Sequence, residues 1–137
     1  MKIDLNKYIG MWHEIAKIEN AYEPNLTHVI ANYTMNEDGN IKVVNSGWVN
    51  GKMVQINGVA TKGEGEDTFK VSFSCKEPSV YKILAIDKNY RYALIGGGDA
   101  NHLWILARTE QIPRQVYNQF IQIAQKHGYN VAKLMLN

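Results

Sequence analysis

The sequence predicts an all-β protein in which about eight antiparallel strands follow one another and a single helix comes last. Short apolar runs alternate with turn-forming clusters at a spacing of about 8–12 residues, which is typical of β-sandwiches and β-barrels. Apolar and polar residues also alternate within the runs, so that each strand has one apolar face. After Arg108 the apolar residues recur instead at helical spacing. These three observations define the fold class.

Turn-forming residues mark the borders of the expected strands. Asp38-Gly39 is a strong hairpin dipeptide, Asn50-Gly51 leads into another apolar run, and Pro78 breaks the chain between two more. The expected strands are, in chain order, Trp12–Ile18, Val29–Met35, Ile41–Trp48, Met53–Lys62, Thr68–Ser74, Val80–Ile86, Arg91–Ile95 and His102–Arg108.

One helix is expected after the strands, over about residues 113–127. Pro113 suits the first helical position, where its missing N–H would have no partner in any case, and Val116 and Phe120 follow at helical spacing. Gly128 suits the C-terminal cap. A short last strand is expected over about residues 129–135.

The alternating pattern favours a hollow interior. Eight strands can bury their apolar faces between two packed sheets or inside one sheet that closes on itself, and eight is about the number at which a barrel holds one small ligand. Several inward positions carry small residues, which leave space that bulky side chains would fill: Ala31, Gly58, Ala60, Ala85 and Ala93.

Composition excludes several classes of protein. The chain has 137 residues, which fits one domain, and its net charge of +2 is scattered, unlike a nucleic-acid-binding surface. Cys75 is the one cysteine, so internal disulfides and multi-cysteine metal sites are excluded, and the four histidines lack metal-motif spacing. No run is long enough for a membrane-spanning helix, and the polar residues after Met1 do not form a signal peptide. We therefore expect either a cytoplasmic chain or a mature form whose leader was removed.

Three segments, taken in order, resemble the conserved regions of the lipocalin family. They are residues 4–16 with the Gly-x-Trp signature at Gly10 to Trp12, residues 85–94 from Ala85 to Leu94, and residues 103–109 with Arg108. The resemblance covers nearly the whole chain and is closest to bacterial lipocalins of the outer-membrane lipoprotein type. It implies an eight-stranded antiparallel up-and-down β-barrel, or calyx, over about residues 10–108, with the C-terminal helix packed outside. Residues 1–137 would form a single domain with one open end, one closed end and an apolar ligand inside.

The same resemblance implies a structural floor at the closed end of the barrel, made by Gly10, Trp12, Glu14 and Arg108. The Arg108 guanidinium would stack on the Trp12 indole and bind nearby backbone carbonyls. Glu14 shares a face with Trp12, and Arg108 is its candidate partner. His13 departs from the family, which commonly has Tyr at this position.

The inward positions of the strands supply the candidate ligand-binding residues. The tyrosines, Asn45, His102 and Trp104 add polar or amphipathic groups to an apolar wall, as ligand pockets commonly require. The expected set is Ala31, Tyr33, Val43, Asn45, Ile56, Phe69, Val71, Phe73, Tyr81, Ile83, His102 and Trp104. Contacts with the ligand head group are expected at the mouth, from loop residues such as Tyr22, Trp48 and Lys52.

The sequence therefore predicts a non-enzymatic carrier of a small hydrophobic ligand, and similarity to the bacterial lipocalins points to a fatty acid or lysophospholipid. No cofactor, metal or nucleic acid is expected, and the protein would be a monomer or a dimer. Membrane association would come only through a leader or lipid anchor that this chain does not contain. Two alternatives stay open: an isomerase or hydrolase that uses Cys75 or His102, and a haem or tetrapyrrole carrier in which His102 is the ligand.

Overall fold

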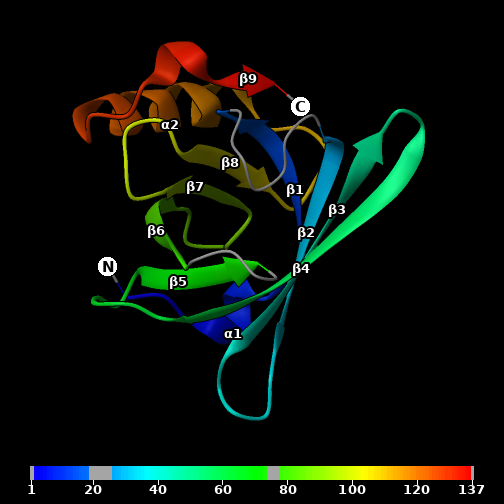
Figure 1. The fold of residues 1–137 in the computed structure, drawn as a ribbon. Coiled ribbons are helices and arrows are strands. Elements are labelled where there is room, and N and C mark those ends of the chain that lie inside the picture. The colour runs from blue at the N-terminus through cyan, green and yellow to red at the C-terminus, as the bar shows by residue number, and fades with distance from the viewer. Residues whose placement is uncertain (1, 19–25, 74–77, 137) are drawn as a thin grey trace.

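The computed structural model describes residues 2–18, 26–73 and 78–136. Eight strands form a closed barrel, and one long helix crosses its outer wall (Figure 1). The elements are α1 (Leu5–Tyr8), β1 (Gly10–Lys17), β2 (Thr27–Met35), β3 (Ile41–Val49), β4 (Lys52–Lys62), β5 (Thr68–Phe73), β6 (Ser79–Ile86), β7 (Tyr92–Gly96), β8 (Leu103–Ala107), α2 (Arg114–Lys126), the 3₁₀ turn η1 (Val131–Lys133) and β9 (Met135–Leu136). The predicted eight-stranded barrel with an external C-terminal helix is confirmed.

Strand β1 closes the barrel because it pairs on both sides. Its first half, from Gly10 to His13, pairs antiparallel with β2, and its second half, from His13 to Lys17, pairs with β8. All other strands pair with their neighbours in the chain, so the topology is up-and-down. The short strand β9 adds to β1 at Ala16 and Lys17. Closure leaves the eight barrel strands almost no free sheet edge.

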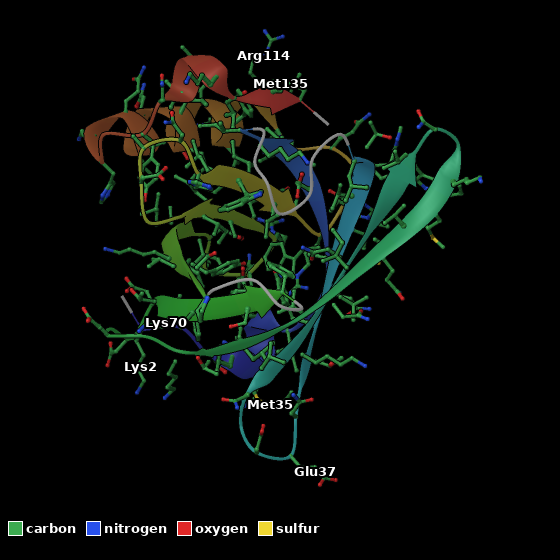
Figure 2. All side chains as sticks on the ribbon, viewed as in Figure 1. Lys2, Met35, Glu37, Lys70, Arg114 and Met135 are labelled. Atoms are coloured by element: carbon green, nitrogen blue, oxygen red, sulfur yellow. The ribbon has the colours of Figure 1, made fainter. Side chains whose placement is uncertain are left out.

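Two hydrophobic clusters lie on opposite faces of the barrel wall. The inner one fills the closed half of the barrel around Trp12 and Ile83, both fully buried. The outer one lies between the wall and α2, where Phe120 and Ala124 are the buried helix residues. Gly128 ends the helix at a φ of +83°, the left-handed conformation that glycine adopts without strain, as predicted. Polar side chains such as Glu37 and Lys70 project into solvent (Figure 2).

The register shifts in two strands change which side chains face inward. In β6 the shift lies between Ile83 and Ala85, and Ala85 joins the outer cluster beneath α2. The expectation that Ala85 faces the interior is therefore wrong, because a bulge inserts one extra residue and reverses the alternation beyond it. Gly58 does leave space inside the barrel, but the Phe73 ring fills it: a Cβ at Gly58 would lie 2.7 Å from that ring.

The C-terminal segment contains less strand than expected. Residues 131–133 form a 3₁₀ turn, and only Met135–Leu136 pair with β1. Asn130 explains the turn, because its backbone N–H donates to the carbonyl of Ala100 at 2.8 Å and ties the segment to the loop before β8. Among the described residues, no helix is long and apolar enough to cross a membrane.

Candidate ligand-binding site

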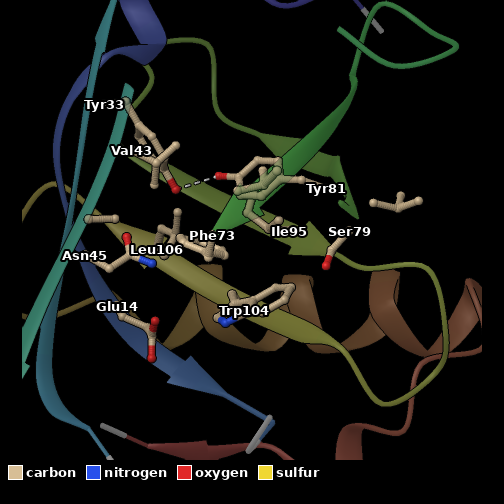
Figure 3. A pocket seen from close by; sticks show the side chains of 13 residues that line it. Glu14, Tyr33, Val43, Asn45, Phe73, Ser79, Tyr81, Ile95, Trp104 and Leu106 are labelled. Atoms are coloured by element: carbon tan, nitrogen blue, oxygen red, sulfur yellow. Dashed lines mark hydrogen bonds between the residues drawn. The ribbon is translucent and has the colours of Figure 1, made fainter. Parts of the chain in front are cut away.

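A cavity opens inside the barrel above a floor of aromatic side chains (Figure 3). Its volume is about 600 Å³ when solvent at the mouth is included. The wall is mostly apolar. Such a lining suits the apolar part of a ligand.

Eight of the twelve predicted ligand-binding residues line this cavity together: Ala31, Tyr33, Val43, Asn45, Val71, Phe73, Tyr81 and Trp104. The other four lie elsewhere. Phe69 lines a smaller cavity beneath the first, and Ile83 is fully buried in the inner cluster. Ile56 lies on β4 opposite Asn45 and is not part of the lining. His102 lies in the loop that precedes β8.

Sequence reasoning left five lining residues out of the candidate ligand-binding set: Glu14, Ser79, Val80, Ile95 and Leu106. Ile95 and Leu106 carry the same signal as the predicted residues, namely strict alternation with outward neighbours on β7 and β8. Ser79 and Val80 both line the cavity although they are consecutive, which alternation does not predict.

Three tyrosine hydroxyl groups form the boundary between the two cavities. Tyr81 Oη bonds to Tyr8 Oη and, at 3.0 Å, to Tyr33 Oη. Tyr33 and Tyr81 line both cavities. Tyr8 comes from α1, and the centre of its ring lies 5.3 Å from the centre of the Trp12 ring. Burial raises the pKa of Tyr8 and of Tyr81 well above 10.0, so both phenols stay neutral at physiological pH. We refer to Tyr8, Tyr33 and Tyr81 as the tyrosine floor.

Beneath the tyrosine floor, Trp12 and Arg108 close the barrel. The Arg108 guanidinium carbon lies 3.8 Å from the centre of the Trp12 ring. The guanidinium donates to four backbone carbonyls, those of Lys7, Tyr8, Met11 and Tyr90, at 2.7–3.1 Å. Gly10 makes room for it: its φ is +104°, and a Cβ there would lie 3.3 Å from Arg108 Nη1. The stacked pair thus joins α1, β1 and the β6–β7 loop.

Glu14 does not lie with Gly10, Trp12 and Arg108 at the closed end of the barrel, contrary to the sequence prediction. It lines the ligand cavity, and its Oε1 lies 3.8 Å from Lys17 Nζ. The prediction of an Arg108 partner is wrong, because the Arg108 guanidinium donates its hydrogen bonds to backbone carbonyls. A register shift between Glu14 and Ala16 places Ala16 in the outer cluster and returns Lys17 to the interior.

His102 lies at the rim of the open end, in an outer groove that includes Trp104. Its Nδ1 lies 2.7 Å from Asp99 Oδ1, and this hydrogen bond holds the pKa of Asp99 below its ordinary value. Hypotheses that assign His102 a catalytic or haem-binding role therefore concern the rim and not the main cavity. Cys75 and Tyr22 lie outside the described residues, and Trp48 is 45% exposed on β3.

The comparison with known families agrees with this geometry, because residues 3–137 match the model of the lipocalin-like domain. The chain belongs to the lipocalin family. It is 37% identical to temperature-induced lipocalin-1 of Arabidopsis thaliana over 143 residues, covering 96% of this chain and 77% of the relative. It is 35% identical to the outer membrane lipoprotein Blc of Escherichia coli over 136 residues, with the same coverage. The resemblance inferred from the three sequence segments is thus confirmed.

Solved structures show the same lipocalin fold. Insecticyanin of the tobacco hornworm Manduca sexta superposes with a TM-score of 0.81 at 22% identity, over 99% of this chain and 80% of that one. Lobster apocrustacyanin A1 gives a TM-score of 0.81 at 15% identity, over 96% and 77%. Membership of this family implies that the barrel binds a small hydrophobic ligand.

Proposed function

We propose that this lipocalin is a non-enzymatic carrier of a single-chain lipid, either a fatty acid or a lysophospholipid, which it holds in the barrel cavity. The observation that carries the proposal is the cavity itself: its wall is mostly apolar, and the tyrosine floor closes its inner end. An acyl chain matches such a space, with its methyl end directed to the floor.

The energetics of burial support an acyl chain. Each buried methylene contributes about 0.8 kcal/mol, so ten of them contribute about 8 kcal/mol before the costs of association. Loss of ligand freedom removes several kcal/mol, which leaves affinity of about micromolar. The barrel wall is held by continuous strand pairing around its circumference, so little further ordering of the protein accompanies binding.

Displacement of an environment-sensitive fatty-acid probe tests the proposal. We expect saturable binding of palmitate and of palmitoyl lysophospholipids at micromolar concentrations, and weaker binding after Trp104→Ala or Tyr81→Ala, since both side chains line the cavity. Phe120→Leu is the matched control, because Phe120 lies on α2 and packs against the outside of the barrel. Absence of saturable binding for all apolar ligands would exclude the carrier function.

The enzymatic alternative makes a different prediction. Turnover of a lipid ester or an isomerisable lipid, lost on Cys75→Ser or His102→Ala, would replace the carrier proposal. Organic extraction of the purified protein followed by mass spectrometry distinguishes the two classes further, because a carrier retains an unaltered ligand.

A further inference from the structure

Two buried side chains of opposite charge lie at the ligand cavity: Glu14 in its lining and Lys17 beside Glu14. Glu14 and Lys17 have side chains that are only 5% and 4% exposed, and Glu14 Oε1 lies 3.8 Å from Lys17 Nζ. Glu14 is part of the cavity lining. Lys17 pairs across the β1–β8 ladder with Trp104, which also lines the cavity, and residues directly opposite in an antiparallel pair share a face. Both charged groups therefore belong to the interior of the barrel.

The β-bulge in β1 makes this arrangement. Without it, Glu14 and Ala16 would face inward and Lys17 would face outward, away from Glu14. The bulge lets Ile15 and Ala16 both join the outer cluster, so that Lys17 turns back toward Glu14. Bulges of this kind are often found next to binding sites, where they redirect a single side chain.

Stability alone gives little reason for such a pair. Removal of two charges from water is costly, and buried ion pairs can often be replaced by apolar residues without loss of stability. A few polar groups in an otherwise apolar cavity commonly orient the polar part of a ligand.

The position of the pair fits the head-group end of the ligand. Figure 3 shows Glu14 and Trp104 on the side of the cavity away from Tyr33 and Tyr81. A lipid whose chain ends at the tyrosine floor therefore brings its head group to Glu14 and Trp104, with Lys17 next to Glu14. The Trp104 ring also offers an aromatic face, which favours alkylated ammonium groups.

The signs of the two charges limit the class of head group. A ligand with one negative charge is attracted by Lys17 and repelled by Glu14, so the two effects oppose each other. A ligand with one negative and one positive charge places each beside its opposite, and both contacts are attractive. Building on the proposed carrier function, we infer that the preferred ligand is a single-chain zwitterionic lipid, with its anionic group at Lys17 and its ammonium group at Glu14.

Four ligands with the same sixteen-carbon acyl chain test this inference on the unmodified protein: lysophosphatidylcholine, lysophosphatidic acid, palmitate and monopalmitoylglycerol. We expect the dissociation constant of lysophosphatidylcholine to be lower than those of the other three by about tenfold, which corresponds to about 1.4 kcal/mol. A second measurement uses the neutral double variant Glu14→Gln/Lys17→Met, which removes both charges together and leaves no lone buried ion. It should lose that preference.

Glu66→Gln/Lys70→Met is the matched control, because both of these charged side chains are exposed on the outside of the barrel. It should keep the preference for lysophosphatidylcholine. Equal binding of palmitate, lysophosphatidic acid and lysophosphatidylcholine by the unmodified protein would overturn the inference and leave the carrier function intact. An unchanged preference in the neutral double variant would also overturn it. Failure of all four ligands to bind would overturn the carrier proposal itself.

Discussion

Arg108 and Trp12 close the barrel together, although they are 96 positions apart in the chain: the guanidinium carbon lies 3.8 Å from the centre of the indole ring. The same guanidinium binds four carbonyls from α1, β1 and the β6–β7 loop. A planar group with five donors can stack and bind in these directions at once, and a lysine ammonium cannot. The pair therefore fixes the N-terminal segment against the end of β8.

Arg108→Lys should destabilise the protein by about 1–3 kcal/mol, because four backbone carbonyls, two of them in partly buried hydrogen bonds, lose a charged donor and the indole loses its stacking partner. The free energy of unfolding in urea measures this. Arg91→Lys is the control: Arg91 is 59% exposed and pairs with Asp87 at the surface, so its replacement should change stability by no more than about 0.5 kcal/mol. Equal effects of the two substitutions would show that the Trp12–Arg108 pair does not stabilise the floor.

Tyr81→Phe should destabilise the protein by about 1–3 kcal/mol at neutral pH, because Tyr81 is the shared partner of Tyr8 and Tyr33. The substitution removes the Tyr81 hydroxyl, to which the buried hydroxyl groups of Tyr8 and Tyr33 both bond. Tyr117→Phe, in α2, serves as the control for removal of a phenol hydroxyl and should have little effect. Unfolding curves of the two variants, compared under the same conditions, decide the matter.

The tyrosine floor also predicts a loss of stability in base. The folded pKa values of Tyr8 and Tyr81 are raised by burial above the ordinary 10.0, so the folded state holds protons that the unfolded state releases. The stability that these two protonated phenols contribute is fully present below pH 10. It is lost as the pH rises toward their folded-state pKa values. Each group contributes a slope of at most about 1.4 kcal/mol per pH unit. The free energy of unfolding, measured from pH 8 to pH 11, should fall less steeply in Tyr81→Phe than in the unmodified protein.

Gly58→Ala should destabilise the barrel by about 1–3 kcal/mol through overpacking. A Cβ at this position would lie 2.6 Å from the backbone oxygen of Ser72 and 2.7 Å from the Phe73 ring, which lines the ligand cavity. Both the β5 backbone at Ser72 and the Phe73 ring must therefore shift, and lipid affinity should change as well. Gly98→Ala is the control, since its Cβ would meet only ordinary contacts of 3.6–3.7 Å with Val80. Thermal unfolding and probe displacement on both variants check the prediction.

Phe120→Ala should separate stability from ligand binding. The side chain is 5% exposed in the outer cluster between α2 and the barrel, and its removal should cost about 3–5 kcal/mol. Lipid affinity, measured at a temperature where the variant is folded, should stay the same, because Phe120 does not line the cavity. A large loss of affinity in the folded variant would mean that the packing of α2 controls the shape of the cavity.

The alternating pattern of the sequence determined most of the barrel. Val43, Val71 and Trp104 face the cavity because they occupy alternate positions in strands of period two, and this period holds wherever the ladder is regular. The family signature around Trp12 and Arg108 likewise identified the closed end, because the fold brings these two positions together. Strand periodicity and the family resemblance were sufficient for both.

Tertiary structure decided where the alternation breaks and what fills the barrel. The bulges in β1 and β6 depend on how each strand aligns with its partner, so the inward position of Lys17 and the outward position of Ala85 do not follow from either strand alone. Tyr8 reaches Tyr81 from a four-residue helix, too short for a periodic pattern, across 73 positions of chain. The sequence by itself thus determined an eight-stranded calyx with a stacked floor. The depth of its cavity and the charged pair within it came only from the register between strands, which long-range packing sets.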